Sequence, residues 1–269
     1  MNQNYTLSSS GDMLRYQNSF DPDFIRKTIL KNNLKGLQIL EFTESTKLES
    51  LESISKLTFL ENLGFASSFH HDFSFLSNLV NLKWLSISAP KYSNLDVSNF
   101  KKLESLSTDW CAKGISGLID CPKLRKLQIW RYNERNLLPL GILDYLTSLD
   151  IRTSSLQALE GINNFKSLKY LALGNCPKLL SIAGVSCLSD LDAIRINSCK
   201  KITSYQDLQT LENLKSIELI DCGDVRDFNS IFEMKRLNDF KALGKTTLID
   251  YENGIDHRIR NFLYYHKGS

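Results

Sequence analysis

Histidine, cysteine and carboxylate side chains carry most enzymatic and metal chemistry, so the possible chemistry of this chain begins with them. The four histidines are His70, His71, His257 and His266. The run His70-His71-Asp72 contains metal-ligating types, but adjacent residues of an extended loop point apart. Because Phe69 and Phe73 flank this run, we expect a turn packed by aromatic rings and no metal site.

The other sequence motifs that carry chemistry do not occur. There is no Gly-rich phosphate loop, no phosphate-binding Lys-Ser/Thr pair, no G-x-S-x-G elbow and no H-E-x-x-H helix. The six cysteines form no C-x-x-C pair, which disfavours zinc-knuckle and thioredoxin-type sites. We therefore expect neither enzyme activity nor a cofactor.

Charge and hydropathy restrict the partners. A net charge of +3 over 269 residues, without a run of five basic residues, disfavours nucleic acid as the ligand. The first residues lack the pattern of a secretory signal, and no stretch of about 18 apolar residues could cross a membrane. These features favour a cytoplasmic protein.

Leucine recurs with a fixed spacing that must position any functional side chain. A Leu-x-x-Leu-x-Leu phrase, with substitutions, occurs ten times, and its central position advances by 26 residues once and then by 21 to 23. Those central residues are Leu37, Leu63, Leu85, Leu106, Leu127, Leu149, Leu171, Ile194, Ile217 and Phe240. A period of this length indicates a solenoid of stacked coils.

Each coil combines two rhythms. The end of the phrase alternates apolar and other residues, which predicts a strand with one buried face. Between phrases, apolar residues recur at every third position from Leu156 to Leu168, which suits a 3₁₀ turn against the core. We expect a strand, a tight turn and a short helical return in every coil.

The pattern over residues 34–245 resembles the leucine-rich repeat family, in the short class of about 22 residues found in bacterial internalins and in a phosphatase regulator. The resemblance implies an α/β solenoid: a horseshoe or arc of about ten coils, with a parallel sheet on the concave face and 3₁₀ or helical returns on the convex face. The family usually has Asn five residues after the second Leu, where its amide bonds the turn. This chain has cysteine there in four coils, as F-box repeats do, at Cys111, Cys176, Cys199 and Cys222.

That placement predicts buried free thiols. Cys121 falls at another apolar position of the repeat, whereas Cys187 fits neither register and its exposure stays open. A ladder of thiols could bind a soft metal, but no histidine or carboxylate recurs beside it.

The two ends depart from the repeat. Residues 1–33 contain an acid, Asp21, before apolar residues at helical spacing, which predicts a helical N-terminal cap; a partner-docking arm is the alternative. Residues 246–269 are expected to form a C-terminal cap. At the junction with this cap, 245–251 suggests an irregular strand, and within the cap 256–264 suggests a short helix with Ile259, Phe262 and Leu263 inward.

The residues beside each buried Leu point outward and stack in columns, in which residues of adjacent coils lie about 4.8 Å apart. Exposed Trp, Tyr and Arg side chains are the types that dominate binding hot spots. The candidate partner-binding residues are therefore Trp84, Asp109, Trp110, Trp130, Arg131, Tyr132, Asp150, Arg152, Tyr170 and Arg195. Trp110, Arg131 and Tyr132 are expected at the rim of this face.

A simpler interpretation of these columns remains open. Asp109, Trp130 and Arg152 could satisfy one another across the strands, and the column Arg195, Glu218 and Lys241 is expected to do so. The neighbourhood of Trp130 favours binding instead.

The expected function is a monomeric, non-catalytic scaffold that binds a protein through its concave sheet. Leaderless bacterial chains with similar repeats include proteins that neutralise a toxin by occluding it, which is the narrower expectation. Two alternatives are an internalin-like surface or secreted adhesion protein and a substrate-recruiting subunit of a larger enzyme complex.

Overall fold

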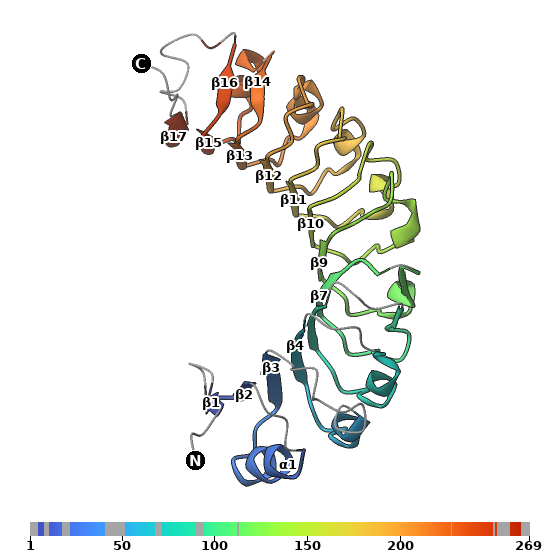
Figure 1. Cartoon of the computed structure of the whole chain (residues 1–269). Helices are drawn as coiled ribbons and strands as arrows, with labels where there is room; N and C mark the ends of the chain where they lie inside the picture. The colour runs from blue at the N-terminus through green and yellow to red at the C-terminus, as the bar shows by residue number, and fades with distance from the viewer. Residues whose placement is uncertain are drawn as a thin grey trace. The chain divides into compact units, whose positions relative to one another are not determined.

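The chain folds into stacked coils, each with one strand of a parallel sheet. The computed structural model describes residues 5–7, 11–17, 22–40, 52–67, 72–89, 94–111, 113–226, 228–249, 251 and 259–264. The chain divides into two compact units, Met1–Leu124 and Arg125–Ser269 (Figure 1). All four histidines, and with them the His70-His71 pair, lie outside the described residues.

Alternation of inward apolar residues with residues on the sheet face produces the strands. In the strand β10 (Ser148–Arg152), Leu149 and Ile151 are buried completely, Ser148 and Arg152 remain partly exposed, and Asp150 on the sheet face is 9% exposed. The three-residue rhythm that follows leads into the 3₁₀ turn η5 (Ile162–Asn164), and its apolar residues from Leu156 to Leu168 are also buried. Each coil therefore has a sheet face and a turn side.

In the first unit, the sheet has the order β1-β2-β3-β4-β5-β7, with β1 antiparallel to β2 and the other neighbours parallel. Its strands are β1 (Tyr5–Leu7), β2 (Met13–Gln17), β3 (Gly36–Leu40), β4 (Asn62–Ala66), β5 (Trp84–Ser88) and β7 (Ser105–Asp109). A small parallel pair joins β6 (Leu95–Asp96) to β8 (Ile115–Ser116). The turns are η1 (Ser53–Lys56), η2 (Ser74–Asn78) and η3 (Leu118–Asp120).

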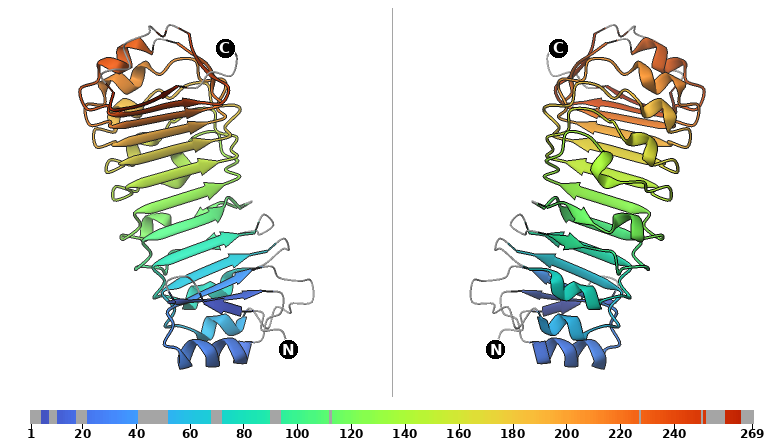
Figure 2. Two further views of the ribbon diagram at one scale, coloured as in Figure 1. Left: turned by 90° about the vertical axis from the view of Figure 1, so that its left-hand side faces the viewer. Right: turned by 90° about the vertical axis from the view of Figure 1, so that its right-hand side faces the viewer.

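In the second unit, seven strands run parallel in the order β9-β10-β11-β12-β13-β15-β17. Besides β10 they are β9 (Lys126–Trp130), β11 (Tyr170–Gly174), β12 (Ala193–Asn197), β13 (Ser216–Ile220), β15 (Asp239–Leu243) and β17 (Asn261–Tyr264). A second pair joins β14 (Gly223–Val225) to β16 (Thr246–Leu248). The turns, besides η5, are η4 (Leu138–Leu140), η6 (Val185–Cys187), η7 (Gln206–Thr210) and η8 (Asn229–Glu233). Figure 2 shows the strands side by side in one layer with the turns behind it.

The expected thiol column is confirmed as buried. Cys111, Cys176, Cys199 and Cys222 are at most 3% exposed, and Cys121 is 5% exposed. All six cysteines are free, and Cys187, whose exposure the sequence left open, is exposed. The Cys222 thiol donates to the carbonyl of Ile220 at 3.4 Å and to that of Ile196 at 3.3 Å, so it bonds the backbone of its own coil and of the preceding one.

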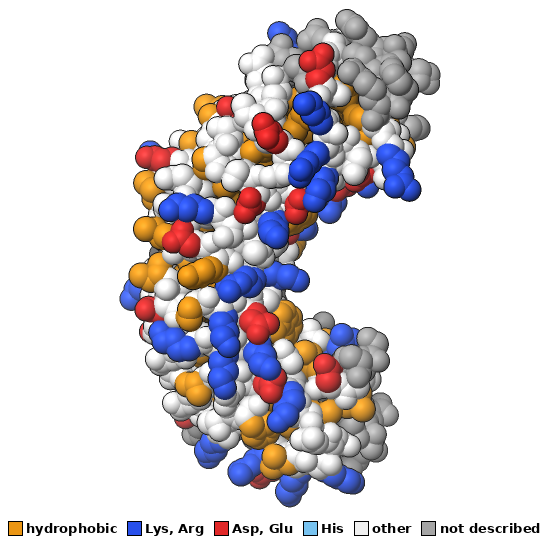
Figure 3. All heavy atoms as spheres, turned by 180° about the vertical axis from the view of Figure 1, so that it is seen from behind, with side chains coloured by type: hydrophobic (Ala, Val, Ile, Leu, Met, Phe, Trp, Pro, Cys, Tyr) orange, Lys and Arg blue, Asp and Glu red, His pale blue; other side chains and the backbone are white. Residues whose placement is uncertain are grey.

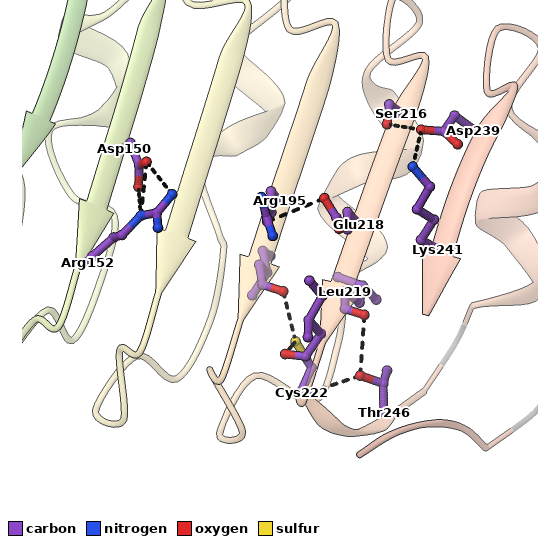
Figure 4. Close-up of polar contacts among 12 residues, drawn as sticks. Asp150, Arg152, Arg195, Ser216, Glu218, Leu219, Cys222, Asp239, Lys241 and Thr246 are labelled. Carbon is purple, nitrogen blue, oxygen red and sulfur yellow. Dashed lines mark hydrogen bonds and ion pairs between the residues drawn. The ribbon is translucent and has the colours of Figure 1, made fainter. Parts of the chain in front are cut away.

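Thr246 occupies the equivalent place in the next coil, where its side chain also donates to backbone carbonyls of its own coil and of the preceding one. Its hydroxyl donates to the carbonyl of Leu243 at 2.9 Å. It also donates to the carbonyl of Leu219 at 3.5 Å (Figure 4). The same oxygen accepts the backbone N–H of Cys222 at 3.1 Å. A hydroxyl thus satisfies buried backbone groups where the preceding coils use a thiol.

At the N-terminal end, the helix expected after Asp21 is present as α1 (Pro22–Lys31), which buries Ile25 and Ile29. A strand was not expected in this region. β2 nevertheless pairs in parallel with β3, so the parallel ladder includes residues before position 34.

At the C-terminal end, the expected short helix is wrong over its described part. Residues 252–258 lie outside the described residues, and Asn261–Tyr264 form the strand β17. Pairing with β15 satisfies an edge of the sheet that would otherwise leave its N–H and C=O groups open. Alternation along this strand stacks Phe262 on Phe240 with ring centroids 5.4 Å apart, but leaves Leu263 49% exposed rather than inward.

Candidate binding surface

Trp130 is a large aromatic side chain that the sheet of the second unit presents to solvent. It ends β9, is 37% exposed, and lies directly opposite Arg152 of β10. The guanidinium carbon of Arg152 lies 5.1 Å from the centre of the Trp130 ring. This is a cation–π contact, so the expected neighbourhood of these two residues is observed.

Asp150 fixes the position of that guanidinium. Nε of Arg152 donates to both carboxylate oxygens of Asp150, at 2.9 and 3.0 Å, and Nη2 donates to Oδ2 at 2.8 Å (Figure 4). Gln128 of β9 adds a hydrogen bond from Nε2 to Oδ2 at 2.9 Å. The hydrogen bonding to Asp150 raises the pKa of Arg152. Arg152 is therefore a permanent cation held in one orientation.

A hollow of about 180 Å³ opens next to this pair. Its floor is made by the small residues Ala172 and Gly174 of β11, which sit beside Asp150 and Arg152 in the sheet register. Arg195 and Asn197 of β12 line the far side. The hollow therefore exists because one strand carries almost no side-chain volume between two strands that carry arginines.

Arg195 is less firmly held than Arg152. Its Nε lies 3.4 Å from Oε2 of Glu218, and its side chain is 39% exposed. The expected column of Arg195, Glu218 and Lys241 is only partly correct, because Lys241 pairs with Asp239 of its own strand at 3.4 Å. Lys241 thus forms an ion pair with an aspartate two residues earlier on its own strand, as Arg152 does with Asp150.

Four residues that the sequence placed on the exposed face or its rim are buried, and that expectation is wrong for them. Asp109 is 2% exposed, Trp110 8% exposed and Asp150 9% exposed. Tyr132 is completely buried, and its hydroxyl donates to the carbonyl of Asn136 at 2.7 Å. After β9 the chain turns into the core only at the second residue, so Tyr132 closes the core instead of forming a rim, whereas Arg131 before it stays exposed.

The other predicted residues keep some exposure. In the first unit, Trp84 is partly exposed on β5, where its ring lies over Gly64. In the second, Arg131 is exposed just after β9 with a positive φ of 56°, and Tyr170 is partly exposed on β11 outside the hollow. The residues brought together around one space are Trp130, Asp150, Arg152 and Arg195.

Sequence reasoning missed the residues that create the space. Ala172 and Gly174 stand in the outward columns, but small side chains do not attract attention in a search for hot spots. The signal was their contrast with Asp150, Arg152 and Arg195 in adjacent coils. Gln128, which completes the contacts of Asp150, was also not identified.

The described part of the chain gives no sign of two other kinds of site. Among these residues no group of three or more His, Cys, Asp or Glu side chains could hold a metal ion. Within the same residues, no helix has the length and apolar character needed to cross a membrane.

Comparisons with known proteins bear on the fold. No protein-family model matches the chain, and no curated protein matches it in sequence. The solved structure of the internalin InlF from Listeria monocytogenes is 19% identical, covers 94% of this chain and 86% of its own, and gives a TM-score of 0.50. The functional domain of InlJ from the same species, which includes a cysteine ladder, is 16% identical over 93% of this chain and 67% of its own, also with a TM-score of 0.50. The periodic strands, the 3₁₀ returns and these two likenesses together give the chain the leucine-rich repeat fold.

Proposed function

We propose that the chain is a non-catalytic scaffold that binds a protein partner through the sheet face of its second unit, centred on Trp130. The observation that carries this proposal is an exposed tryptophan, 37% accessible, which a firmly bonded arginine holds beside a hollow. Large rigid side chains of this kind contribute most to protein interfaces because they bury much area at little entropic cost.

The arrangement is preorganised for binding. Arg152 is anchored by Asp150, so neither it nor the Trp130 ring needs to be ordered when a partner arrives. Side chains that are already fixed avoid a cost of about 0.5–1.5 kcal/mol each on association. Mixed acidic, basic and aromatic groups on one face suit a folded protein better than a polyanion.

A second surface of the same unit competes with this proposal. Large apolar side chains are exposed off the strands at Leu138, Ile142, Tyr145 and Leu180, each between 49% and 62% accessible. Figure 3 shows apolar side chains along the margin that carries the turns. None of these four residues lines the hollow that holds the fixed Arg152, so we favour the Trp130 face.

The two surfaces can be separated with one matched pair of variants. Tyr145 lies 5.2 Å from the guanidinium carbon of Arg125, nearly the same contact that Trp130 makes with Arg152 at 5.1 Å. Partner capture is measured with the purified wild-type chain and with Trp130→Ala and Tyr145→Ala. We expect Trp130→Ala to abolish capture and Tyr145→Ala to preserve it. The reverse result would place the partner on the turn side and overturn the proposal.

A photo-crosslinking amino acid that carries an aromatic ring makes the same comparison while keeping a ring at the position it replaces. Placed at position 130 it should form an adduct with the captured protein, and placed at position 145 it should not. Adducts at both positions would contradict a site confined to the sheet face.

The compartment and the narrower role belong to the same proposal. Free thiols persist in a reducing compartment, and this chain has six, which supports the cytoplasm. Neutralisation of a toxin by occlusion is the narrower role that we propose there. Recovery of a toxic protein whose activity the chain suppresses would support that role, whereas recovery of a host surface receptor would favour an adhesion protein.

A further inference from the structure

We propose that the hollow between Arg152 and Arg195 binds a carboxylate group of the protein partner. The inference rests on the proposed function, because it names the chemistry that the sheet face of the second unit recognises. It is carried by three features of the hollow: its unused hydrogen-bond donors, its charge and its shape.

The two arginines that line the hollow have donors to spare. Arg152 uses Nε and Nη2 for Asp150, and its Nη1 has no partner among the residues that the structure describes. The ion pair of Arg195 with Glu218, at 3.4 Å, is longer than a strong charged hydrogen bond. Guanidinium groups bind carboxylates through parallel hydrogen bonds, so these spare donors match a carboxylate.

The one acidic residue in the lining is already satisfied. Asp150 accepts three hydrogen bonds from Arg152 and one from Gln128, so it does not compete for the spare donors. The lining therefore contains two arginines and one carboxylate, Asp150, which Arg152 already engages. Glu218 lies outside the lining and pairs with Arg195 only at 3.4 Å, so a single partner carboxylate has only that long ion pair to displace, whereas a doubly charged phosphate brings more negative charge than the lining balances.

The shape fits a short acid rather than a bulky one. A hollow of about 180 Å³ is of the size that accepts a benzene-sized group, about 150 Å³ in an engineered protein cavity. Ala172 and Gly174 provide an apolar floor for a methylene stem, and Trp130 stands at one side. A carboxylate on a short stem can thus reach between the two guanidiniums.

The hollow can be filled without a change of charge. Gly174 does not have a positive φ, and a Cβ built on it would lie 3.4 Å from Cγ of Arg152, an ordinary contact. In the strand register Gly174 is equivalent to Ile220 of β13, two strands further along, so this column already accommodates an isoleucine. Gly174→Ile should therefore preserve the strand and occupy the hollow. Arg195→Met removes one donor group, and Lys241→Met is its matched control because Lys241 stands in the same column but does not line the hollow.

Three small probes identify the source of the carboxylate. N-acetylglutamate α-amide offers only a side-chain carboxylate, N-acetylalanine only a terminal one, and N-acetylglutamine α-amide neither. Binding is followed by NMR through the Nε–H signals of Arg152 and Arg195. We expect saturable shifts with at least one acid and none with the neutral amide. The acid that binds tighter tells whether an acidic side chain or a chain terminus is recognised.

The variants decide the outcome. Arg195→Met should weaken acid binding about tenfold or more, because a charged hydrogen bond is lost. Gly174→Ile should weaken it by a similar factor because the isoleucine fills the hollow. Lys241→Met should leave the affinity for the acid unchanged. Equal responses to the acid and the amide, tighter binding of inorganic phosphate, or full acid affinity in both Gly174→Ile and Arg195→Met would overturn the inference.

Partner capture separates this inference from the proposed function. If Trp130→Ala abolishes capture but Gly174→Ile and Arg195→Met do not, the sheet face binds the partner and the carboxylate site is refuted. If the acids bind the hollow but Trp130→Ala leaves capture intact, the hollow binds acids while the proposed function fails.

Discussion

Arg152 and Asp150 lie two residues apart on β10, on the same face, and the guanidinium closes on the carboxylate through hydrogen bonds of 2.8 to 3.0 Å. The Asp150 side chain is only 12% exposed, whereas that of Arg152 is 37% exposed. The pair therefore places a mostly buried anion beneath a partly exposed cation. The cation faces Trp130, so a contact within one strand determines what the neighbouring strand presents to solvent.

Removing the guanidinium should cost stability as well as binding. In Arg152→Met, Asp150 keeps only the hydrogen bond from Gln128, and a poorly paired buried acceptor costs about 1–3 kcal/mol. We expect urea denaturation to show a loss in that range. The double variant Asp150→Asn with Arg152→Met should recover part of the loss, because no buried charge then remains. A double variant as unstable as the two single losses added together would show that the residues do not act as a pair.

Much of the fold could be predicted because the repeat encodes it. The Leu phrases place buried residues such as Leu149 and Ile151 at alternate positions, and one strand follows from each phrase. The neighbourhood of Trp130 and Arg152 followed from the same count of residues, because parallel strands of equal register bring equivalent positions together.

The rest depended on contacts that a one-dimensional pattern does not specify. Nothing in the spacing showed that Arg152 would bond Asp150 on its own strand rather than Asp109 on another. The burial of Tyr132 follows from the direction of the chain after its strand, which the repeat leaves open. Likewise, Phe262 belongs to a strand because an open sheet edge was available to it, although its local sequence suggests a helix.

Two glycines of neighbouring segments should respond differently to alanine. Gly161 has a φ of 91°, and a Cβ there would lie 2.8 Å from the backbone nitrogen of Leu138. A left-handed conformation alone costs a residue with a side chain about 1–2 kcal/mol, and the close approach adds to it. Gly174→Ala meets only an ordinary contact at 3.4 Å. We expect thermal unfolding to show a clear loss for Gly161→Ala and little change for Gly174→Ala; equal losses would contradict the local geometry.

The number of thiols that react in the native protein should show which cysteines are buried in the solenoid core. Cys187 is exposed, whereas the other five cysteines are buried. Burial raises the pKa of Cys121 to about 11 and also raises that of Cys222, so few reactive thiolates form there near neutral pH. With a chromogenic disulfide reagent we expect one thiol to react in the native protein and six in denaturant.

The pH dependence of that single reaction follows from the same cause. Partial burial raises the pKa of Cys187 too, so its rate should increase with pH and still be increasing above the ordinary thiol range. Cys187→Ser should remove the native reaction entirely. A second fast thiol in that variant would show that the core opens more readily than the buried column indicates.

Thr246 offers a direct test of how the turns are closed. Its hydroxyl bonds the carbonyls of Leu243 and Leu219 and accepts the N–H of Cys222, whereas Cys222 uses its thiol on equivalent carbonyls. Thr246→Val keeps the shape but takes the acceptor away from the buried N–H of Cys222 and one donor from the carbonyls of Leu243 and Leu219, so the free energy of unfolding should fall by about 1–3 kcal/mol. Thr246→Cys restores a donor of the type that the preceding coils use, and should recover part of that loss in the same denaturation experiment. If the cysteine variant is no more stable than the valine variant, the hydroxyl of Thr246 stabilises this one turn through its own fit. A thiol and a hydroxyl would then not be interchangeable as donors to the backbone carbonyls in this column.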